Sequence, residues 1–327
     1  YNLGVIFSEE DLNRLLMPKS SSVPSDSSTF SVTDPVTELL SPSEDVSGHG
    51  THIAGICSGN GRASNGNSQG VAPESSLIVV KLKNETASVY TDYANLMMAV
   101  DFAVRFANSR SLPLSINISY GSNDGSHTGS SLLELFMEQV SLYGKNVICA
   151  ATGNEGLTRR HASLNTISNQ NTYDKSIDFT IAPGERSLYL EIWQTFADDF
   201  FYELFSPSGL ESFVFPAGIY AYMIADTTIY LTINNPTPYQ PFRQYFLSFS
   251  SNTTFITSGT WALHIESTPT GKIVDGRLQF WLPSKEATNS ATGFLVPSSD
   301  MTFTIPSTAS SVISVSGYDS SLDVFAP

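Results

Sequence analysis

Hydrophobic positions follow two different spacings along the chain, and the change from one to the other divides the sequence. Between residues 46 and 160, short apolar runs alternate with stretches of helical periodicity. The run SLIVVKL at 76–82 is short and rich in β-branched residues, which is typical of a strand buried in a parallel sheet. Apolar residues then recur at helical spacing, at Tyr93, Leu96, Met97, Val100, Val104 and Ala107. The alternation predicts a parallel α/β sheet with right-handed crossovers.

Two further apolar segments predict strands of the same sheet. They are LPLSINISYG at 112–121 and NVICAATGNEG at 146–156, and the second ends in a Gly-rich turn. Ligands of parallel sheets bind beyond the carboxyl ends of the strands. We therefore expect a functional site where these segments end, at 119–121 and 152–156.

Two shorter helices are also predicted. Residues 9–16 have a helical pattern and precede a loop rich in Ser, Pro, Thr and Asp. Farther along, Ser131 and Glu134 have the spacing of a capping box, in which each residue satisfies a backbone N–H of the other. The helix that they open runs to Tyr143 and stops at Gly144.

From about residue 165 the pattern changes to short, aromatic, alternating segments separated by turn residues. Seven or more such segments, from SIDFTI to RLQFWLP, predict an antiparallel sandwich of the jelly-roll type. The segment SSVISVSGYD at 310–319 then returns to the buried-strand pattern. The sandwich is therefore predicted to be an insert in the α/β domain. The first part of the α/β core is then 1–165, the insert is 166–295, and the core continues at 296–327.

Composition and charge narrow the class of protein. Of the 327 residues, 41% are hydrophobic and 14% charged, which describes a folded chain with a surface rich in Ser, Thr and Asn. The net charge of −15 argues against nucleic acid or an anionic membrane as a partner. No run of 18 apolar residues occurs, so no membrane span is predicted. Cys57 and Cys149 lie in apolar stretches and are predicted to be buried free thiols.

The segment DVSGHGTHIAGI at 45–56 places His49 between two glycines and His52 three residues later. A metal site is the weaker interpretation, because zinc-binding His pairs on a helix are usually four residues apart with a Glu between them. Ser47 and Gly48 suit a helix N-terminus, which puts His49 in an exposed first turn, where it is either a catalytic base or a solvated loop residue. His52 lies about 300° farther around the helix and is predicted to be buried and structural.

Five short motifs follow one another along the chain: GHGTHIAGI (48–56), GVAPESSLIVVKL (70–82), INISYG (116–121), AATGNEG (150–156) and STASSVISVSGYD (307–319). They occur in the order found in subtilisin-like serine proteases. The chain thus resembles this superfamily, and the resemblance implies an α/β fold with a three-layer, parallel-sheet core. The insert, with SGTWALHIES, DGRLQFWLPS and FLVPSS, is similar in particular to that of the clostridial spore-germination proteases.

The resemblance implies a role for each residue that matches the motifs of the family. His49 matches the general base, which takes the proton of the nucleophilic serine and returns it to the leaving amine. Asn154 matches the side-chain donor of the oxyanion hole, with a plain turn residue as the alternative. The segment that pairs with substrate backbone is matched by Ser119, Tyr120 and Gly121. A wall of the S1 pocket is matched by Ala151, Thr152 and Gly153, and ordinary packing is the alternative for Ala151 and Thr152.

Two catalytic segments of the family do not occur in the sequence. The nucleophile of the family lies in a Gly-Thr-Ser segment, whereas SGTW at 258–261 has a different order and lies in the insert. The catalytic aspartate of the family lies in an Asp-Ser/Thr-Gly turn, and Asp34 and Asp45 have another context. We expect both segments outside this window, so that the chain is a fragment without triad activity of its own.

The sequence therefore predicts a serine endopeptidase with an Asp-His-Ser triad, seen as a fragment. The alternative is an inactive pseudoprotease that binds or signals in spore germination, and the presence of both His49 and Asn154 favours the enzyme. Carbohydrate binding by the sandwich is a third interpretation, based only on its fold and aromatic content. The expected partners are a protein or peptide substrate and the protein's own cleaved pro-segment, in a secreted or spore-associated location. No cofactor or metal is expected, since the loop 59–70 has no carboxylate for calcium.

Overall fold

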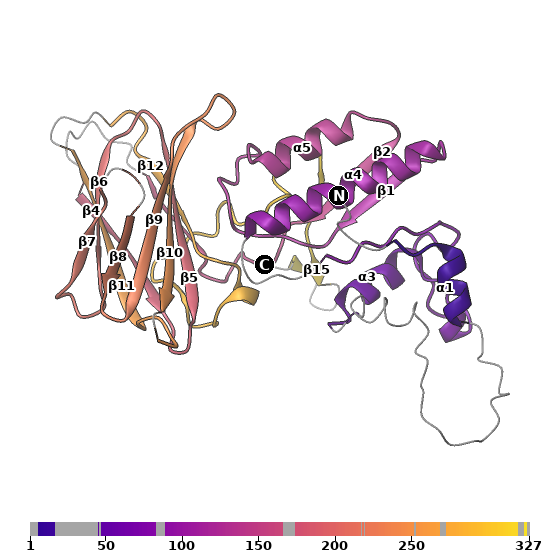
Figure 1. Ribbon diagram of the computed structural model, residues 1–327, viewed down its shortest axis with the longest axis horizontal. Helices are drawn as coiled ribbons and strands as arrows, with labels where there is room; N and C mark the ends of the chain where they lie inside the picture. Colours follow the sequence, from indigo (N-terminus) through magenta and orange to yellow (C-terminus); the bar gives the residue numbers. More distant parts are fainter. Residues whose placement is uncertain are drawn as a thin grey trace, which may run out of the picture. The chain divides into compact units, whose positions relative to one another are not determined.

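The structure is a computed structural model that describes residues 6–16, 45, 47–82, 89–165, 174–216, 218, 220–251, 253–268, 273–319 and 324–325. The chain divides into two compact units, Tyr1–Lys81 and Leu82–Pro327, which are described separately (Figure 1). Across the described ranges, no helix has both the length and the apolar character needed to cross a membrane.

The described part of the first unit is helical. Helix α1 spans Glu9–Leu16, helix α3 spans His49–Ser58, and a 3-10 helix covers Arg62–Ser64. Ser8 closes the start of α1, because its hydroxyl accepts a hydrogen bond from the backbone N–H of Asp11 at 3.2 Å. Both α-helices lie where the sequence pattern predicted them.

The strand predicted at 76–82 does not form. These residues belong to none of the described sheets, and the side chains of Leu77, Val79 and Val80 are exposed. A strand exists only where a neighbour supplies the hydrogen bonds of a ladder, and an apolar run does not specify that neighbour. The prediction was therefore wrong for this segment.

The second unit contains the predicted parallel sheet. Strands β1 (Leu114–Ile118), β2 (Asn146–Ala151) and β14 (Ile313–Val315) pair in the order β1-β2-β14, all parallel. The return of the chain to this sheet after the long β-region was predicted, and β14 confirms it. Burial of β14 was not confirmed, because this strand lies at the edge of the described sheet and its side chains are exposed.

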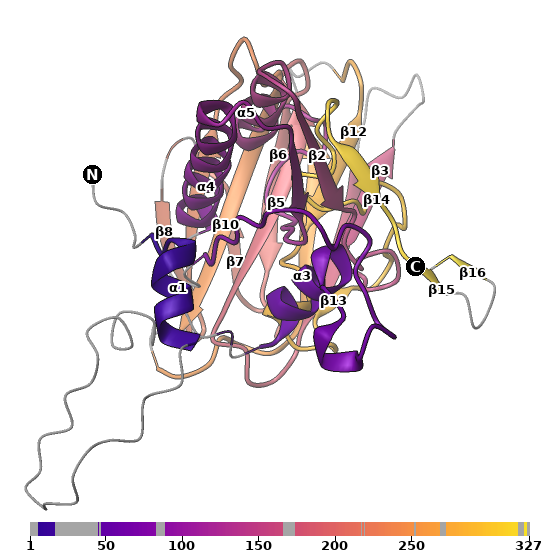
Figure 2. The same ribbon diagram turned by 90° about the vertical axis from the view of Figure 1, so that its right-hand side faces the viewer.

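Helices α4 (Val89–Ser109) and α5 (Leu132–Ser141) cover one face of this sheet (Figure 2). The predicted capping box of α5 is present: the backbone N–H of Ser131 donates to Glu134 Oε2 at 2.9 Å, and that of Glu134 donates to Ser131 Oγ at 3.2 Å. Val147 points to the opposite face of the sheet and is 48% exposed within the described residues. The third layer of the predicted core therefore stays a prediction.

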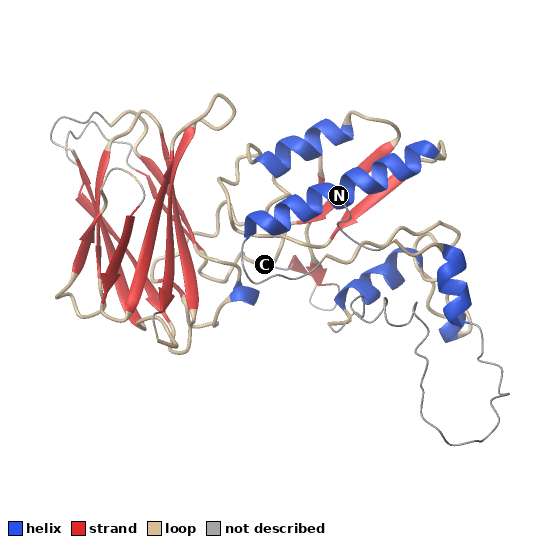
Figure 3. Ribbon diagram, viewed as in Figure 1, coloured by secondary structure: helices blue, strands red, loops and turns tan. Residues whose placement is uncertain are grey.

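The rest of the second unit is a β-sandwich of two antiparallel sheets (Figure 3). The strand orders are β3-β12-β5-β10-β9-β8 in one sheet and β13-β4-β11-β6-β7 in the other. The strands span β3 His161–Asn165, β4 Asp174–Ile181, β5 Ser187–Thr195, β6 Phe200–Phe205, β7 Ser212–Val214, β8 Tyr220–Ile224, β9 Thr227–Asn234, β10 Phe242–Ser251, β11 Gly259–Ser267, β12 Arg277–Trp281 and β13 Gly293–Phe294. A 3-10 helix at Lys285–Ala287 and a two-stranded sheet of β15 (Tyr318–Asp319) and β16 (Val324–Phe325) complete the described elements.

Alternating side chains of the two sheets form the core of the sandwich. Phe179 and Leu263 come from one sheet, Leu190 and Leu247 come from the other, and all four are fully buried. Each such side chain contributes about 1.5–3 kcal/mol to folding. The sandwich is therefore held together by its own apolar interior.

The sandwich begins earlier than the predicted boundary between residues 165 and 166. Strand β3 pairs with β12, with Ala162 opposite Phe280, and so belongs to the six-stranded sheet. At the other end, β13 pairs with β4 in the five-stranded sheet, and the predicted end of the insert at 295 stays a prediction. Periodicity did not reveal β3, because HASLN has no apolar alternation.

Candidate active site

Asp45 closes the N-terminus of α3, the helix that begins with His49. Its Oδ1 accepts a hydrogen bond from the backbone N–H of Gly48 at 2.9 Å. Its Oδ2 accepts from both the hydroxyl and the backbone N–H of Thr51, at 2.7 and 2.8 Å. These hydrogen bonds, that of the Thr51 hydroxyl first, hold the pKa of Asp45 well below its usual value. Asp45 is thus the anion at the helix N-terminus, where the helix dipole favours negative charge.

His49 is the first residue of α3, and its residue surface is exposed. This agrees with the prediction of an exposed first-turn histidine. His52 is exposed as well, so the prediction that it is buried and structural was wrong. The reason is that no residue of α3 is buried: the helix contains Gly50, Ala54 and Gly55, which offer little side-chain surface to bury.

Asn154 lies on the turn that follows strand β2. Gly153, just before it, has a φ of 84°, a conformation that suits glycine and reverses the chain direction. The residue surface of Asn154 is exposed, so its amide is accessible for a hydrogen bond to a ligand. Thr152 is buried and anchors the turn, since its N–H donates to the carbonyl of Val315 on β14 at 3.0 Å.

Thr304 brings the two predicted substrate-binding segments together. Its side chain occupies the space beside both Gly121 and Gly153, where a Cβ on either glycine would clash with it. Its backbone N–H donates to the carbonyl of Thr152 at 2.9 Å, and the next residue, Ile305, exchanges two backbone hydrogen bonds with Ser122. The segments 119–121 and 151–153 therefore lie side by side at the carboxyl ends of β1 and β2. The sequence analysis missed Thr304, because nothing in the sequence says what fills the space beside a glycine.

Within this arrangement the predicted residues differ in accessibility. Ser119, Tyr120, Gly121 and Ala151 are half-buried, Thr152 is buried, and Gly153 and Asn154 are exposed. The buried state of Thr152 favours a packing role for its side chain. The half-buried segment 119–121 retains accessible surface, as a segment that pairs with substrate requires.

The loop that continues from the 119–121 segment is buried although it is polar. Asn123 donates through Nδ2 to the carbonyl of Leu282 at 3.1 Å, and Gln240 donates through Nε2 to Ser126 Oγ at 3.0 Å. Both partners belong to the β-region, so residues 122–127 form a hydrogen-bonded junction between the α/β part and the sandwich. The candidate substrate-binding segment is thereby tied to the sandwich.

His127 is part of the same junction. Its imidazole stacks on Trp281 with the ring centroids 4.4 Å apart, and its nitrogens face the carbonyls of Phe303 and Asn123 at 2.6 and 3.1 Å. Burial lowers the pKa of His127 to about 4. The ring is therefore neutral in the folded protein at neutral pH.

A buried pair of carboxyl groups lies at the centre of the junction. Glu191 of β5 is fully buried, and its Oε2 accepts hydrogen bonds from the N–H groups of Gly125, Trp193 and Gln244 at 2.7–3.1 Å. The carboxyl of Asp124 interacts directly with that of Glu191, and burial raises the pKa of both groups. Within the described residues, neither Glu191 Oε1 nor Asp124 Oδ2 has a hydrogen-bond donor. Because two buried carboxylates in contact repel each other, we expect the folded protein to hold one proton between them.

The carboxyl pair predicts that the second unit loses stability as the pH rises. Above about pH 5 the unfolded chain has both carboxyls ionised, whereas the folded chain retains the shared proton, because its pKa is raised. The free energy of unfolding should fall by up to about 1.4 kcal/mol per pH unit until the proton is lost. Urea unfolding between about pH 7.5 and 9 measures this slope, in a range where the imidazole of His127 is neutral in both the folded and the unfolded chain.

Glu191→Gln is the matched variant for this measurement. The glutamine carbonyl can accept from the same three N–H groups, and its amide can donate to Asp124, so no proton is needed. The slope should be flatter in this variant than in the parent chain. An equal slope in the two proteins would contradict the shared proton.

The two predicted catalytic residues belong to different units. His49 lies in the first unit, whereas Asn154 and both substrate-binding segments lie in the second. The structure thus brings together Asn154 and the residues around Thr304, and the approach of His49 to them stays a prediction. Cys57 and Cys149 are free thiols, as predicted, but both are half-buried instead of fully buried.

Comparisons with known proteins agree with the motifs. Residues 4–182, more than half of the chain, match the Subtilase family of peptidases. The chain belongs to this family. Among solved structures it is similar to the Clostridium perfringens CspB protease, with 30% sequence identity and a TM-score of 0.75. That match covers 89% of this chain and 59% of the CspB chain.

Proposed function

We propose that this chain is the greater part of the catalytic region of a serine endopeptidase. The observation that carries the proposal is the arrangement around Thr304, which sets Asn154 and the segments 119–121 and 151–153 at one edge of the parallel sheet. A protease needs a donor for the developing oxyanion and an extended edge for substrate backbone at such a place. Membership of the Subtilase family supports the assignment.

The proposed mechanism gives each residue one task. His49 takes the proton from the serine hydroxyl as that oxygen attacks the scissile carbonyl, and returns it to the leaving amine. The Asn154 amide donates a hydrogen bond to the carbonyl oxygen as negative charge develops on it. The backbone of Ser119, Tyr120 and Gly121 pairs with the substrate chain. The 327 residues contain neither a Gly-Thr-Ser segment nor an Asp-Ser/Thr-Gly turn, so the proposal applies to a polypeptide that also supplies these two segments.

We further propose that the protein belongs with the clostridial germination proteases and that its sandwich is an inserted jelly-roll variant. The similarity to a clostridial protease supports the first point. For the second, β4, β6 and β11 lie in one sheet, whereas β5 and β10 lie in the other, so the chain crosses repeatedly between sheets as in a jelly roll. Proposed partners are protein or peptide substrates and the protein's own pro-segment.

The full-length reading frame and a fluorophosphonate probe test the proposal. We expect a frame that encodes both missing segments and a protein that the probe labels at the serine of the Gly-Thr-Ser segment. Labelling should be lost in a variant in which that serine is replaced by alanine. A frame without the serine, together with no labelling, would identify the protein as a pseudoprotease.

A further inference from the structure

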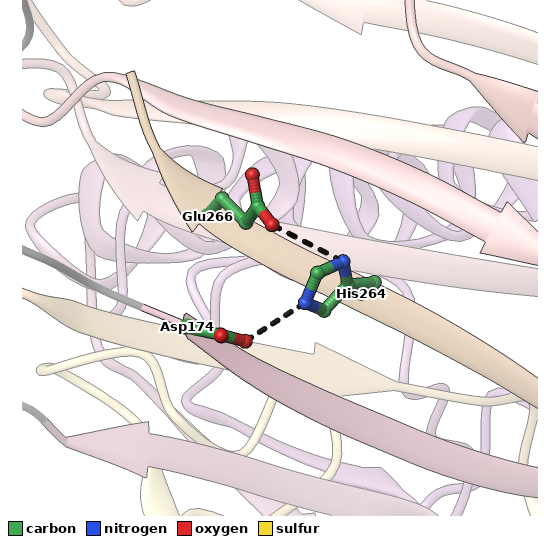
Figure 4. Close-up of side chains that lie close together, drawn as sticks. All are labelled: Asp174, His264 and Glu266. Carbon is green, nitrogen blue, oxygen red and sulfur yellow. Dashed lines mark hydrogen bonds and ion pairs between the residues drawn. The ribbon is translucent and has the colours of Figure 1, made fainter. Parts of the chain in front are cut away.

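A histidine and two carboxylates gather on the outer face of the five-stranded sheet, away from the candidate active site. Asp174 begins strand β4, and His264 and Glu266 lie on the neighbouring strand β11 (Figure 4). On β11 they alternate with Leu263 and Ile265, which are fully buried in the sandwich core. The strand period of two therefore fixes His264 and Glu266 on the outer face.

Strand register sets the spacing of the three side chains. Asp174 and Glu266 are direct partners across the β4–β11 ladder, and His264 lies two residues before Glu266. His264 Nε2 lies 2.8 Å from Asp174 Oδ1, and Nδ1 lies 3.7 Å from Glu266 Oε1. One ligand atom from each residue can be chosen so that all three lie within 4.8 Å of one another. Within the described ranges, no other group of three or more His, Cys, Asp and Glu side chains meets this spacing.

A bound cation would stabilise this arrangement. Two carboxylates directly opposite each other on neighbouring strands repel one another, and the chain as a whole is strongly acidic. The contact between Glu266 and the imidazole, at 3.7 Å, is longer than a hydrogen bond. A cation bound by both carboxylates and by one imidazole nitrogen removes the repulsion.

We propose that Asp174, His264 and Glu266 bind a zinc ion. Zinc accepts imidazole nitrogen together with carboxylate oxygen, whereas calcium and magnesium prefer oxygen ligands alone. Three protein ligands and one water complete the tetrahedral geometry of zinc, in which ligand atoms are about 3.4 Å apart. His264 Nε2 already lies beside Asp174, and the side chains of Asp174 and Glu266 are 78% and 49% exposed, so both carboxylates have solvent-accessible surface from which to approach a bound ion.

The neighbouring glutamate on the third strand does not join this site. Glu203 of β6 is the ladder partner of His264 on its other side. Its Oε1 accepts a hydrogen bond from the Ser212 hydroxyl at 2.6 Å, which holds its carboxylate toward β7. The proposed site therefore has three protein ligands and joins the start of β4 to the end of β11. It does not depend on the proteolytic function proposed above.

Titration of the 327-residue chain with zinc alone, after treatment with a chelator, tests the proposal. Calorimetry should show that one zinc ion binds per chain at this site. When Co²⁺ replaces zinc, a visible absorption band should appear. His264→Ala and Asp174→Asn should each weaken the binding by more than about 100-fold, because loss of even an outer partner of a zinc ligand costs 10- to 100-fold. Zinc should also raise the thermal unfolding temperature of the parent chain and not that of His264→Ala.

Asp178→Asn is the matched control. Asp178 lies on the same face of the same strand, and its carboxylate accepts a hydrogen bond from the Ser176 hydroxyl at 2.7 Å. This variant removes the same charge as Asp174→Asn and leaves the three ligands in place, so zinc binding should stay within a few-fold of the parent value. Equal loss in the two variants, or binding that His264→Ala does not weaken, would overturn the proposal, and so would a parent chain that binds no zinc.

Discussion

Replacing His49 with alanine in the full-length protein should lower kcat by about 10⁶-fold, the loss found when the histidine of a subtilisin is removed. The magnitude is taken from that family member. The physical reason is that a serine hydroxyl is a weak nucleophile until a neighbouring base accepts its proton. Steady-state hydrolysis of a chromogenic peptide measures kcat. The variant should remain folded, because His49 is exposed and Asp45 still accepts the hydrogen bonds at the start of α3.

The matched control for this experiment is His52→Ala. His52 lies on the same helix, is also exposed, and has no proposed task in the reaction. Its replacement should leave kcat within a few-fold of the parent value and the unfolding temperature unchanged. If His49→Ala hydrolysed the peptide at the parent rate, His49 would not be the base. If both variants lost activity equally, the helix as a whole would be responsible.

Asn154→Ala should lower kcat by about 10²- to 10³-fold and leave KM almost unchanged. This magnitude also comes from a subtilisin, in which the side-chain donor of the oxyanion hole was replaced. The effect falls on kcat because the hydrogen bond strengthens as charge develops on the carbonyl oxygen, and so acts more on the transition state than on bound substrate. Leu157→Ala, a change to an exposed residue near the same turn, is the control and should leave kcat unaltered.

Whether the loss of activity in Asn154→Ala appears in kcat or in KM decides the role of Asn154. A loss confined to KM would show that the side chain contacts the substrate and does not stabilise the oxyanion. Asn154→Asp provides a second comparison, because a carboxylate has the same shape and cannot donate when ionised. It should lower kcat at least as much as alanine does.

The sequence by itself determined the elements whose signals are local. The capping box of Ser131 and Glu134 fixed the start of α5, because both of its hydrogen bonds join residues three apart. Alternating aromatic segments predicted a sandwich in the β-region. Side chains two apart along a strand lie on the same face, and an apolar face is buried when a second sheet packs against it. The family motifs at 48–56 and 150–156 likewise supplied the proposed roles of His49 and Asn154, because short segments can be matched one residue at a time.

Only the tertiary structure decided which distant residues meet. The segment 76–82 has the composition of a strand but belongs to none of the described sheets, and His52 is exposed on a helix that buries none of its residues. Thr304 fills the space beside Gly121 and Gly153, each more than 150 positions away in the chain. His264 meets Asp174 across 90 positions through the register of β4 and β11, and Glu191 of β5 meets Asp124 of the buried loop 122–127 at the junction. Periodicity reports which face of an element is apolar, whereas strand register and side-chain packing select the residue on the other side of each contact.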